Sequence, residues 1–316
     1  MLFFKSKKEK ELISLLEAQD KKIAKMEKFE TAHQEMLNNI FIYHKLKPAP
    51  FTEISRKLSY ELVMFMKNVC SKYDLDWWLD YGTLLGAVRH ENFVPWDDDL
   101  DSGMMRADLE VLKSVLPDEI EANNLKYVKT HIKLDKHTDL KTKRWFQLKY
   151  NHPDFKGSFS VLDVFPYDYI KDYDEDTGDK FNKLLWNYYT FSKDDDMTPY
   201  MEKYFTEMNI TLEKEDCLIP GIEGVRGSGG YASIYPFKII KYDEIFPLKS
   251  MKFGDYEFPV PNQTRKYITD IYGENYFRIP NKVREHGVYQ KNIKQDNILS
   301  AINEGIEALK TANSKY

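Results

Sequence analysis

Apolar residues recur at helical spacing near the start of the chain. Residues 6–40 contain neither glycine nor proline, and their pattern is set by Leu12, Leu15, Leu16, Ile23, Met26, Phe29, Met36 and Ile40. Spacings of three, four and seven residues place such positions on one helical face. Glu30 and His33 interrupt a heptad seam that begins at Leu16. We therefore expect a long helix that packs on the body of the protein or pairs with a second chain as a homo-oligomer.

A second amphipathic segment follows Pro48 and Pro50, which break the first helical pattern. Apolar side chains recur there at helical intervals, at Leu58, Leu62, Phe65, Met66 and Val69. This spacing predicts a helix over residues 53–73, with Thr52 as its N-cap. A similar pattern near the end of the chain predicts a terminal helix, whose buried face carries Ile298, Ile302, Ile306 and Leu309.

Short apolar strands alternate with helical stretches in the middle of the chain. We expect strands in DWWLDYG (76–82), LDSGMMR (100–106), RWFQLKYN (144–151) and SFSVLDVFPYDYI (158–170). One short helix is expected from Gly82 through Val88, and another that stops near Pro117. This order predicts an α/β (α+β) fold with a mixed β-sheet flanked by helices. We expect an N-terminal helical extension at 1–48, the sheet domain at 49–290 and a C-terminal helix at 291–316.

Composition and charge narrow the class of protein. The chain is 42% hydrophobic and 31% charged, as in globular domains, and its net charge of −5 argues against a nucleic-acid partner. Cys70 and Cys217 match no zinc or disulfide spacing, which predicts two reduced thiols. No stretch approaches the roughly 18 apolar residues of a transmembrane segment. We expect a cytoplasmic protein that could also contact the inner face of the membrane peripherally.

Carboxylates are concentrated around residue 99. Asp97, Asp98, Asp99 and Asp101 lie within residues 96–102. On an extended strand, Asp99 and Asp101 point to the same side, and such a pair raises its own pKa unless a cation neutralises it. Mg²⁺ binds oxygen ligands of this kind, commonly together with substrate phosphates. The spacing therefore predicts a site for Mg²⁺ or Mn²⁺.

Asp163 is the predicted third acid of this site. It is a lone carboxylate between apolar residues, where burial is costly unless the charge is paired or ligated. On a neighbouring strand it would complete a two-ion site with Asp99 and Asp101; a capping role at a strand end is the alternative. The acids around residue 99 could instead form a solvated loop, or a calcium loop ending at Asp108, although that motif's glycine and final glutamate are missing.

The Gly82-Thr83 turn follows a strand and opens a helix. The free N–H groups at such a turn favour a phosphate group. Arg89 and His90 end the same helix; Arg89 could clamp a phosphate, and His90 either joins it or is a structural partner. The segment GIEGVRGSGGYAS (221–233) has five glycines in its first ten residues but matches no phosphate-binding motif, so a mobile loop is expected there.

The segment YGTLLGAVRHENFVPWDDDLD (81–101) resembles the signature of the LicD family, which is shared with fukutin-related proteins. The resemblance continues in VLDVFPYDYI and in residues 242–276, and it covers about residues 55–286. The family belongs to the nucleotidyltransferase-fold superfamily, whose pattern is a Gly-Ser/Thr turn, a D-x-D pair and a third acid. Arg284 and His286, near the end of this stretch, could reach a phosphate or the acceptor.

The resemblance implies a phosphotransferase. It would move a phospho-alcohol, such as phosphocholine, from a CDP-activated donor to a hydroxyl of a glycan or lipid-linked glycan, such as teichoic acid, lipopolysaccharide or a capsule precursor. Asp99, Asp101 and Asp163 would bind two metal ions, Gly82 and Thr83 would hold the donor phosphate, and Arg89 would add positive charge. Two different functions stay open: a nucleotidyltransferase that expels pyrophosphate, and a non-catalytic scaffold in glycan assembly.

Overall fold

The computed structural model describes residues 7–44, 50–134, 141–153, 159–225, 237–279 and 296–316. The chain forms two compact units, Met1–Leu46 with Phe277–Val283, and Lys47–Tyr276 with Arg284–Tyr316. Among the described helices, none is both long enough and apolar enough to cross a lipid bilayer. Most of the glycine-rich segment, and both Arg284 and His286, lie outside the described residues.

The first unit contains helix α1 (Lys7–Tyr43), which confirms the long helix predicted near the start of the chain. Its apolar stripe is exposed, with Leu12, Leu15, Leu16, Ile23, Met26, Phe29 and Met36 all accessible. Asn38 and Phe41, near the end of the helix, are buried. There the N–H of Ile279 donates to Asn38 Oδ1 at 2.9 Å. Pairing of the exposed stripe with a second copy of the chain stays a prediction.

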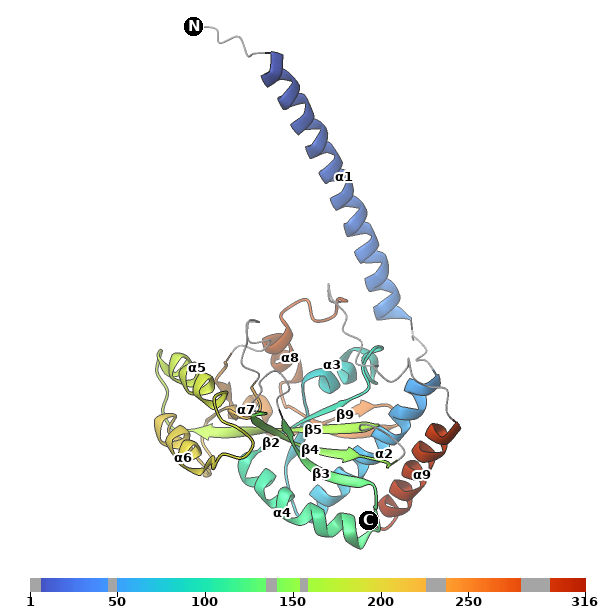
Figure 1. Cartoon of the computed structure of the whole chain (residues 1–316), viewed down its shortest axis with the longest axis vertical. Coiled ribbons are helices and arrows are strands. Elements are labelled where there is room, and N and C mark those ends of the chain that lie inside the picture. Colours follow the sequence, from blue (N-terminus) through green and yellow to red (C-terminus); the bar gives the residue numbers. More distant parts are fainter. Residues whose placement is uncertain (1–6, 45–49, 135–140, 154–158, 226–236, 280–295) are drawn as a thin grey trace. The chain divides into compact units, whose positions relative to one another are not determined.

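The second unit is built on one mixed β-sheet (Figure 1). In spatial order its main strands are β1 (Trp77–Leu79), β2 (Leu100–Met105), β5 (Ser160–Ile170), β4 (Lys143–Tyr150) and β3 (Val128–Leu134). β2 and β5 run parallel, whereas the other neighbours in this order are antiparallel. A mixed sheet with flanking helices confirms the predicted α/β class.

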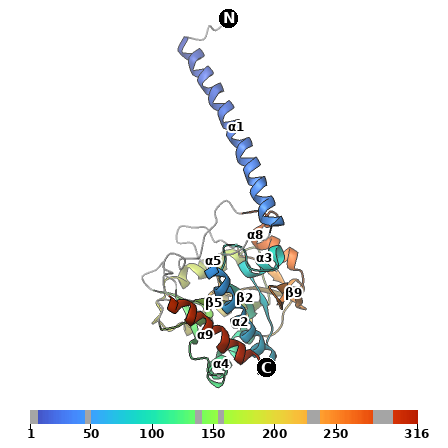
Figure 2. The ribbon, with the colours of Figure 1, turned by 90° about the vertical axis from the view of Figure 1, so that its right-hand side faces the viewer.

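One face of the sheet is covered by α2 (Pro50–Lys72), α4 (Arg106–Ala122) and α9 (Asp296–Asn313). Ser59 of α2 bonds Ser160 of β5 at 2.9 Å between the hydroxyl oxygens, and Tyr150 donates its hydroxyl to the Ala301 carbonyl at 2.8 Å. α9 lies beside α2 (Figure 2). The apolar residues predicted to face the core on these helices, Leu58, Leu62, Phe65, Met66, Val69, Ile298, Ile302, Ile306 and Leu309, are all buried.

The opposite face is partly covered by α3 (Tyr81–His90) and α8 (Thr264–Tyr272). The Tyr81 ring packs on Phe165 of β5 with 4.8 Å between ring centroids. Tyr167, further along β5, bonds Tyr267 of α8 at 2.6 Å between the hydroxyl oxygens. Side chains of β5 that point to this face therefore anchor both helices, and α3 reaches the sheet where β2 begins.

The remaining elements extend the sheet and cover its end. β6 (Ile210–Thr211) and β7 (Cys217–Pro220) pair with the second half of β5, and β8 (Ile240–Lys241) pairs with β7. Helices α5 (Thr177–Tyr188) and α6 (Thr198–Glu207) close a buried apolar cluster there. The last elements are α7 (Tyr242–Ile245) and the hairpin of β9 (Lys249–Phe253) and β10 (Tyr256–Val260). Cys70 and Cys217 are free and buried.

Two predicted helix boundaries are wrong. α2 begins at Pro50, so Thr52 lies inside the helix and is not its N-cap. α4 continues through Pro117, which is exposed. The backbone carbonyl that loses its helical partner at an exposed proline can bond water, so the helix need not end there.

Candidate active site

Asp101 and Asp163 face each other across two parallel strands. Asp101 of β2 and Asp163 of β5 are direct register partners, so both side chains lie on the face of the sheet that carries α3. Burial, and then the negative charge of Asp99, raises the pKa of both carboxyls, that of Asp163 to about 6 and that of Asp101 well above its usual range. Asp101 and Asp163 thus lie side by side, and the Asp99 charge acts on both. Asp163 is the fourth residue of β5, so the strand-end interpretation is wrong.

The Gly82-Thr83 turn binds Asp101 directly. The N–H of Gly82 donates to Asp101 Oδ2 at 3.0 Å, and Thr83 Oγ1 accepts from the Asp101 N–H at 2.7 Å. A Cβ atom on residue 82 would come within 2.9 Å of Asp97 Oδ2 and 3.2 Å of Asp101 Oδ2, so a larger residue would have to displace these carboxylates. The expectation of a free N–H at Gly82 is corrected: a carboxylate of the site already uses it.

Asp80 fixes the start of α3 and has no counterpart in the predicted site. It is fully buried and accepts hydrogen bonds from the Tyr81 N–H at 2.8 Å, the Tyr167 hydroxyl at 2.6 Å and the Tyr267 hydroxyl at 2.9 Å. Burial raises its pKa to about 6. An aspartate immediately before a strand-to-helix turn was the available signal, because aspartate is a favoured N-cap.

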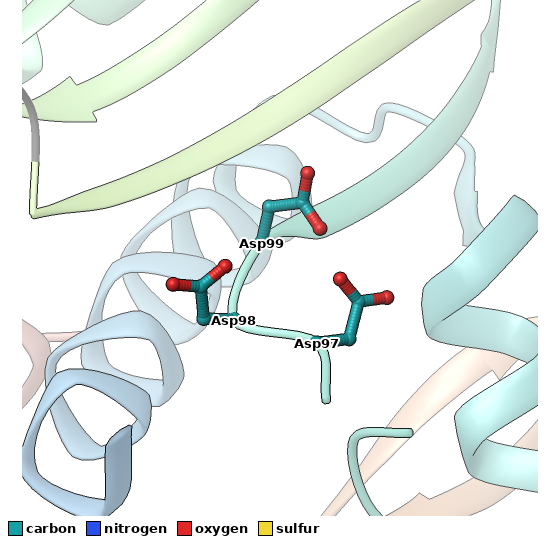
Figure 3. Close-up of side chains that lie close together, drawn as sticks. All are labelled: Asp97, Asp98 and Asp99. Atoms are coloured by element: carbon teal, nitrogen blue, oxygen red, sulfur yellow. The ribbon is translucent and has the colours of Figure 1, made fainter. Parts of the chain in front are cut away.

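Asp97, Asp98 and Asp99 form a second group of carboxylates on the segment that enters β2 (Figure 3). Each offers one oxygen, and these oxygens lie within 4.8 Å of one another. All three side chains are half-buried. This set shares only Asp99 with the predicted metal triad of Asp99, Asp101 and Asp163. Its hard, anionic oxygen donors fit Mg²⁺ or Mn²⁺, with the two buried acids next to them.

The calcium-loop interpretation is wrong. Residues Leu100–Met105 form a strand, and Asp108 lies in the first turn of α4. The strand alone separates Asp101 from Met105 by about 13 Å. Asp108 there accepts a hydrogen bond from the Asp76 N–H at 3.3 Å. The acids around residue 99 therefore do not wrap around one ion as an EF-hand loop does.

Arg56 of α2 holds the acidic segment in place, although sequence reasoning assigned it no role. Its guanidinium is buried and donates to the carbonyls of Val94 at 2.8 Å, Pro95 at 3.1 Å and Asp97 at 2.6 Å. It also lies 5.0 Å from the centroid of the Phe93 ring. Because its partners are backbone carbonyls, the residue types carry no signal that could have identified this arginine.

Arg89 and His90 lie in the last turn of α3, away from the Gly82 end. Seven residues separate Gly82 from Arg89, about 10 Å along a helix. Arg89 donates to the Tyr276 carbonyl at 2.8 Å, and burial lowers its pKa to about 10. Burial, and then the neighbouring Arg89 charge, lowers the pKa of His90 to about 4, so this imidazole is neutral at pH 7. The structure places both residues at the far end of the helix from the turn; their phosphate-binding role stays a prediction.

Gln147 of β4 is a further member of the site that the sequence did not reveal. It lies directly opposite Asp163 in the register, is 1% exposed, and donates from Nε2 to Asp163 Oδ1 at 2.5 Å. Its Oε1 is buried and has no hydrogen-bond partner among the described residues. Only the strand register brings this amide to the carboxylate.

Comparisons with known proteins agree with the sequence signature. Residues 74–212 match the family model described as LicD/FKTN/FKRP, nucleotidyltransferase domain. Over 67 residues the chain is 43% identical to an uncharacterized protein of Rickettsia prowazekii. This alignment covers 20% of this chain and 25% of that protein. Over 42 residues it is 45% identical to the lipopolysaccharide cholinephosphotransferase LicD of Haemophilus influenzae. This alignment covers 13% of this chain and 16% of that protein.

The aligned stretches span about a quarter or less of these curated relatives. The family match, in contrast, runs from the segment before β1 to the end of β6. It contains Asp80, the Gly82-Thr83 turn, the acids from Asp97 to Asp101, and Asp163. Residues 74–212 are therefore similar to the LicD/FKTN/FKRP nucleotidyltransferase domain.

Proposed function

We propose that the protein is a phosphotransferase that moves a phospho-alcohol, such as phosphocholine, from a CDP-activated donor to a hydroxyl of a cell-surface glycan or of its lipid-linked precursor. The observation that carries this proposal is the buried pair of Asp101 and Asp163 at one register position, beside Asp97–Asp99, inside the matched domain. The name of the Haemophilus relative supports a phosphocholine donor group and a lipopolysaccharide acceptor.

Two divalent ions, Mg²⁺ or Mn²⁺, fit this arrangement. Asp97, Asp98 and Asp99 would hold them from the loop, and Asp101 and Asp163 from the strands. When bound, such ions neutralise the diphosphate and the charge that develops on the phosphoryl oxygens. The chain itself keeps the ligands in place: Gly82 and Thr83 hold Asp101, Arg56 holds the backbone at Asp97, and Gln147 holds Asp163.

The reaction itself needs few protein groups. The acceptor hydroxyl attacks the donor phosphorus in line, a new P–O bond forms, and the bond to the CMP oxygen breaks. Asp163 would accept the hydroxyl proton, because it belongs to the buried pair at the site and its second oxygen is not the one bonded by Gln147. A cytoplasmic location, peripheral contact with the inner face of the membrane and assembly through α1 belong to the same proposal.

The test follows the leaving group. Purified protein is incubated with Mg²⁺, CDP-choline and a glycan acceptor, and CMP is measured; the same protein with CTP and a phospho-alcohol is assayed for pyrophosphate. The proposal requires CMP release that depends on acceptor and is lost in Asp163→Asn but kept in Asp172→Asn, which alters an exposed loop carboxylate. Pyrophosphate in place of CMP would establish a nucleotidyltransferase. If neither product forms, the non-catalytic scaffold is the alternative that remains.

A further inference from the structure

Tyr81 has a strained backbone conformation at the start of α3. Its φ is +36°, in the left-handed region that residues other than glycine rarely adopt. The other described residues with a positive φ, glycines excepted, are all exposed, whereas Tyr81 is buried. Strain of this kind persists only where the surrounding structure holds it, and it gathers at functional sites. The contacts that hold the Tyr81 backbone therefore bear on what the turn does.

The next backbone N–H connects this turn to the acidic site. Gly82 donates to Asp101 Oδ2 at 3.0 Å, so the direction of its N–H orients one oxygen of that carboxylate. The backbone before Tyr81 is tied to the same residue, because the Asp80 N–H donates to the Asp101 carbonyl at 3.0 Å. Tyr81 lies between these two bonds. A change in its backbone conformation would turn the Gly82 N–H away from Asp101.

The Asp80 carboxylate holds the Tyr81 backbone, and two tyrosine hydroxyls hold this carboxylate. Asp80 Oδ1 accepts from the Tyr81 N–H at 2.8 Å and from the Tyr267 hydroxyl at 2.9 Å. Asp80 Oδ2 accepts from the Tyr167 hydroxyl at 2.6 Å, and the two hydroxyl oxygens lie 2.6 Å apart. All three side chains are buried. Because no bulk water can replace a lost partner there, the loss of either hydroxyl would leave the carboxylate less firmly oriented.

Tyr267 belongs to a part of the chain that follows the matched domain. It lies on α8, whereas the family match ends at residue 212. α8 packs beside α3 in both views of the ribbon (Figure 1 and Figure 2). The predicted acids of the site all lie inside the match, but the network that orients the turn beside them is completed by a residue outside it.

We propose that Tyr267 and Tyr167 are positioning residues for the reaction. Through Asp80 they keep the Gly82 N–H directed at Asp101 Oδ2. This inference rests on the proposed function of the acidic site. Both hydroxyls act through the turn, so they supply geometry and neither charge nor a proton to the reaction. A carboxylate that loses its fixed orientation should slow the reaction more than it weakens substrate binding.

The variant Tyr267→Phe removes one of these hydroxyls, and Tyr204→Phe is its matched control. Tyr204 is also buried and donates its hydroxyl to a buried aspartate of β5, Asp168, at 2.9 Å. Both variants remove a hydroxyl from a buried carboxylate, so their thermal midpoints should fall by similar amounts. Tyr167→Phe, which removes the other hydroxyl from the turn, should reproduce the effects of Tyr267→Phe.

Hydrogen exchange of single backbone amides, followed by NMR without divalent ions, measures the turn independently of turnover. The Gly82 amide reports on the site. The Gly221 amide, which donates to the Pro166 carbonyl at 2.7 Å, reports on the second half of β5. We expect Tyr267→Phe to speed exchange at Gly82 by about tenfold or more relative to Gly221. Tyr204→Phe should not raise this ratio.

The same variants are then assayed for CMP release. We expect Tyr267→Phe to lower kcat about tenfold, with the KM for CDP-choline within about twofold of wild type. An unchanged exchange ratio, or a fall in kcat no larger than that of Tyr204→Phe, would overturn the inference. Failure of the proposed function has a different signature, because wild-type protein would then release no CMP although exchange at Gly82 still responds to Tyr267→Phe.

Discussion

Strand β5 carries two buried aspartates, five residues apart, in opposite electrostatic settings. Asp168 is paired: Arg106 donates to both of its oxygens, and Tyr204 donates to Oδ2 at 2.9 Å. Asp163 instead lies opposite Asp101, and burial and then the negative charge of Asp99 raise its pKa. Asp168 thus has the cation that a buried charge needs for stability, whereas the group around Asp163 has a surplus of negative charge. The comparison separates an acid that holds the fold together from one suited to bind a cation.

The largest expected effect is the loss of activity when an acid of the group around Asp163 is replaced. Asp101→Asn should lower CMP release by about a thousandfold, because it removes a charged ligand from the reaction centre. The same change removes a buried charge that other carboxylates repel, so the thermal midpoint should stay or rise. Activity and melting are measured on the same preparation. Loss of folding together with activity would place Asp101 in the same class as Asp168.

Replacing the partner of Asp168 should instead lower the stability of the protein. Arg106→Met leaves Asp168 and Glu223 without their guanidinium and should lower the free energy of unfolding by about 3–5 kcal/mol. Lys203→Met on the surface of α6 is the control and should change little. Urea denaturation measures both. A loss below about 1 kcal/mol for Arg106→Met would contradict the assignment of this arginine as the stabilising partner.

The acids paired with Arg106 and those around Asp163 should also contribute to stability with opposite dependence on pH. Burial acts to raise the pKa of Glu223, but the Arg106 charge outweighs it and lowers this pKa to about 2, so the stability it contributes is present above pH 4.5 and is lost as the pH falls toward 2. The pKa of Asp163 is raised to about 6, so its contribution is present below pH 3.8 and is lost as the pH rises through 6.

Unfolding without divalent ions, at several pH values, tests these signs. Glu223→Gln should be less stable than wild type at pH 6 by a few kcal/mol and should approach it near pH 2. Asp163→Asn should match wild type near pH 3.5 and exceed it in stability at pH 7. The same sign for both variants would end the distinction between the two regions.

Helix α1 should show the smallest effect on activity and a distinct effect on assembly. Its exposed Ile23 and Met26 lie on the predicted pairing stripe. Ile23→Glu/Met26→Glu should leave CMP release within about twofold while shifting the mass measured by sedimentation equilibrium from dimer toward monomer. Lys21→Glu/Lys25→Glu changes charge on the same helix as a control. A wild-type protein that sediments as a monomer would remove the homo-oligomer from the account.

The sequence predicted those elements of the fold whose signal lies in a short run of neighbouring residues. The strands around Asp101 and Asp163 were predicted because apolar residues flank both acids, and α1 because its apolar spacing is helical. β3 was missed because VKTHIKL has few apolar residues and leaves one face in water.

The missing parts of the site depend on contacts that no local pattern encodes. Arg56 bonds backbone carbonyls, and Gln147 reaches Asp163 only through the register of β4 and β5. Arg89 and His90 were predicted to end the short helix after the Gly82-Thr83 turn, and both lie in the last turn of α3, while their phosphate-binding role stays a prediction.

Cation binding at the acidic site is the most direct test of the account. Free Mn²⁺ is followed by electron paramagnetic resonance as wild-type protein, Asp163→Asn and the control Asp172→Asn are added in the presence of CDP-choline. The account predicts that wild type and control remove Mn²⁺ from solution with the same affinity, and that Asp163→Asn does so at least about tenfold more weakly. Equal Mn²⁺ binding by all three proteins, or none by wild type, would contradict it.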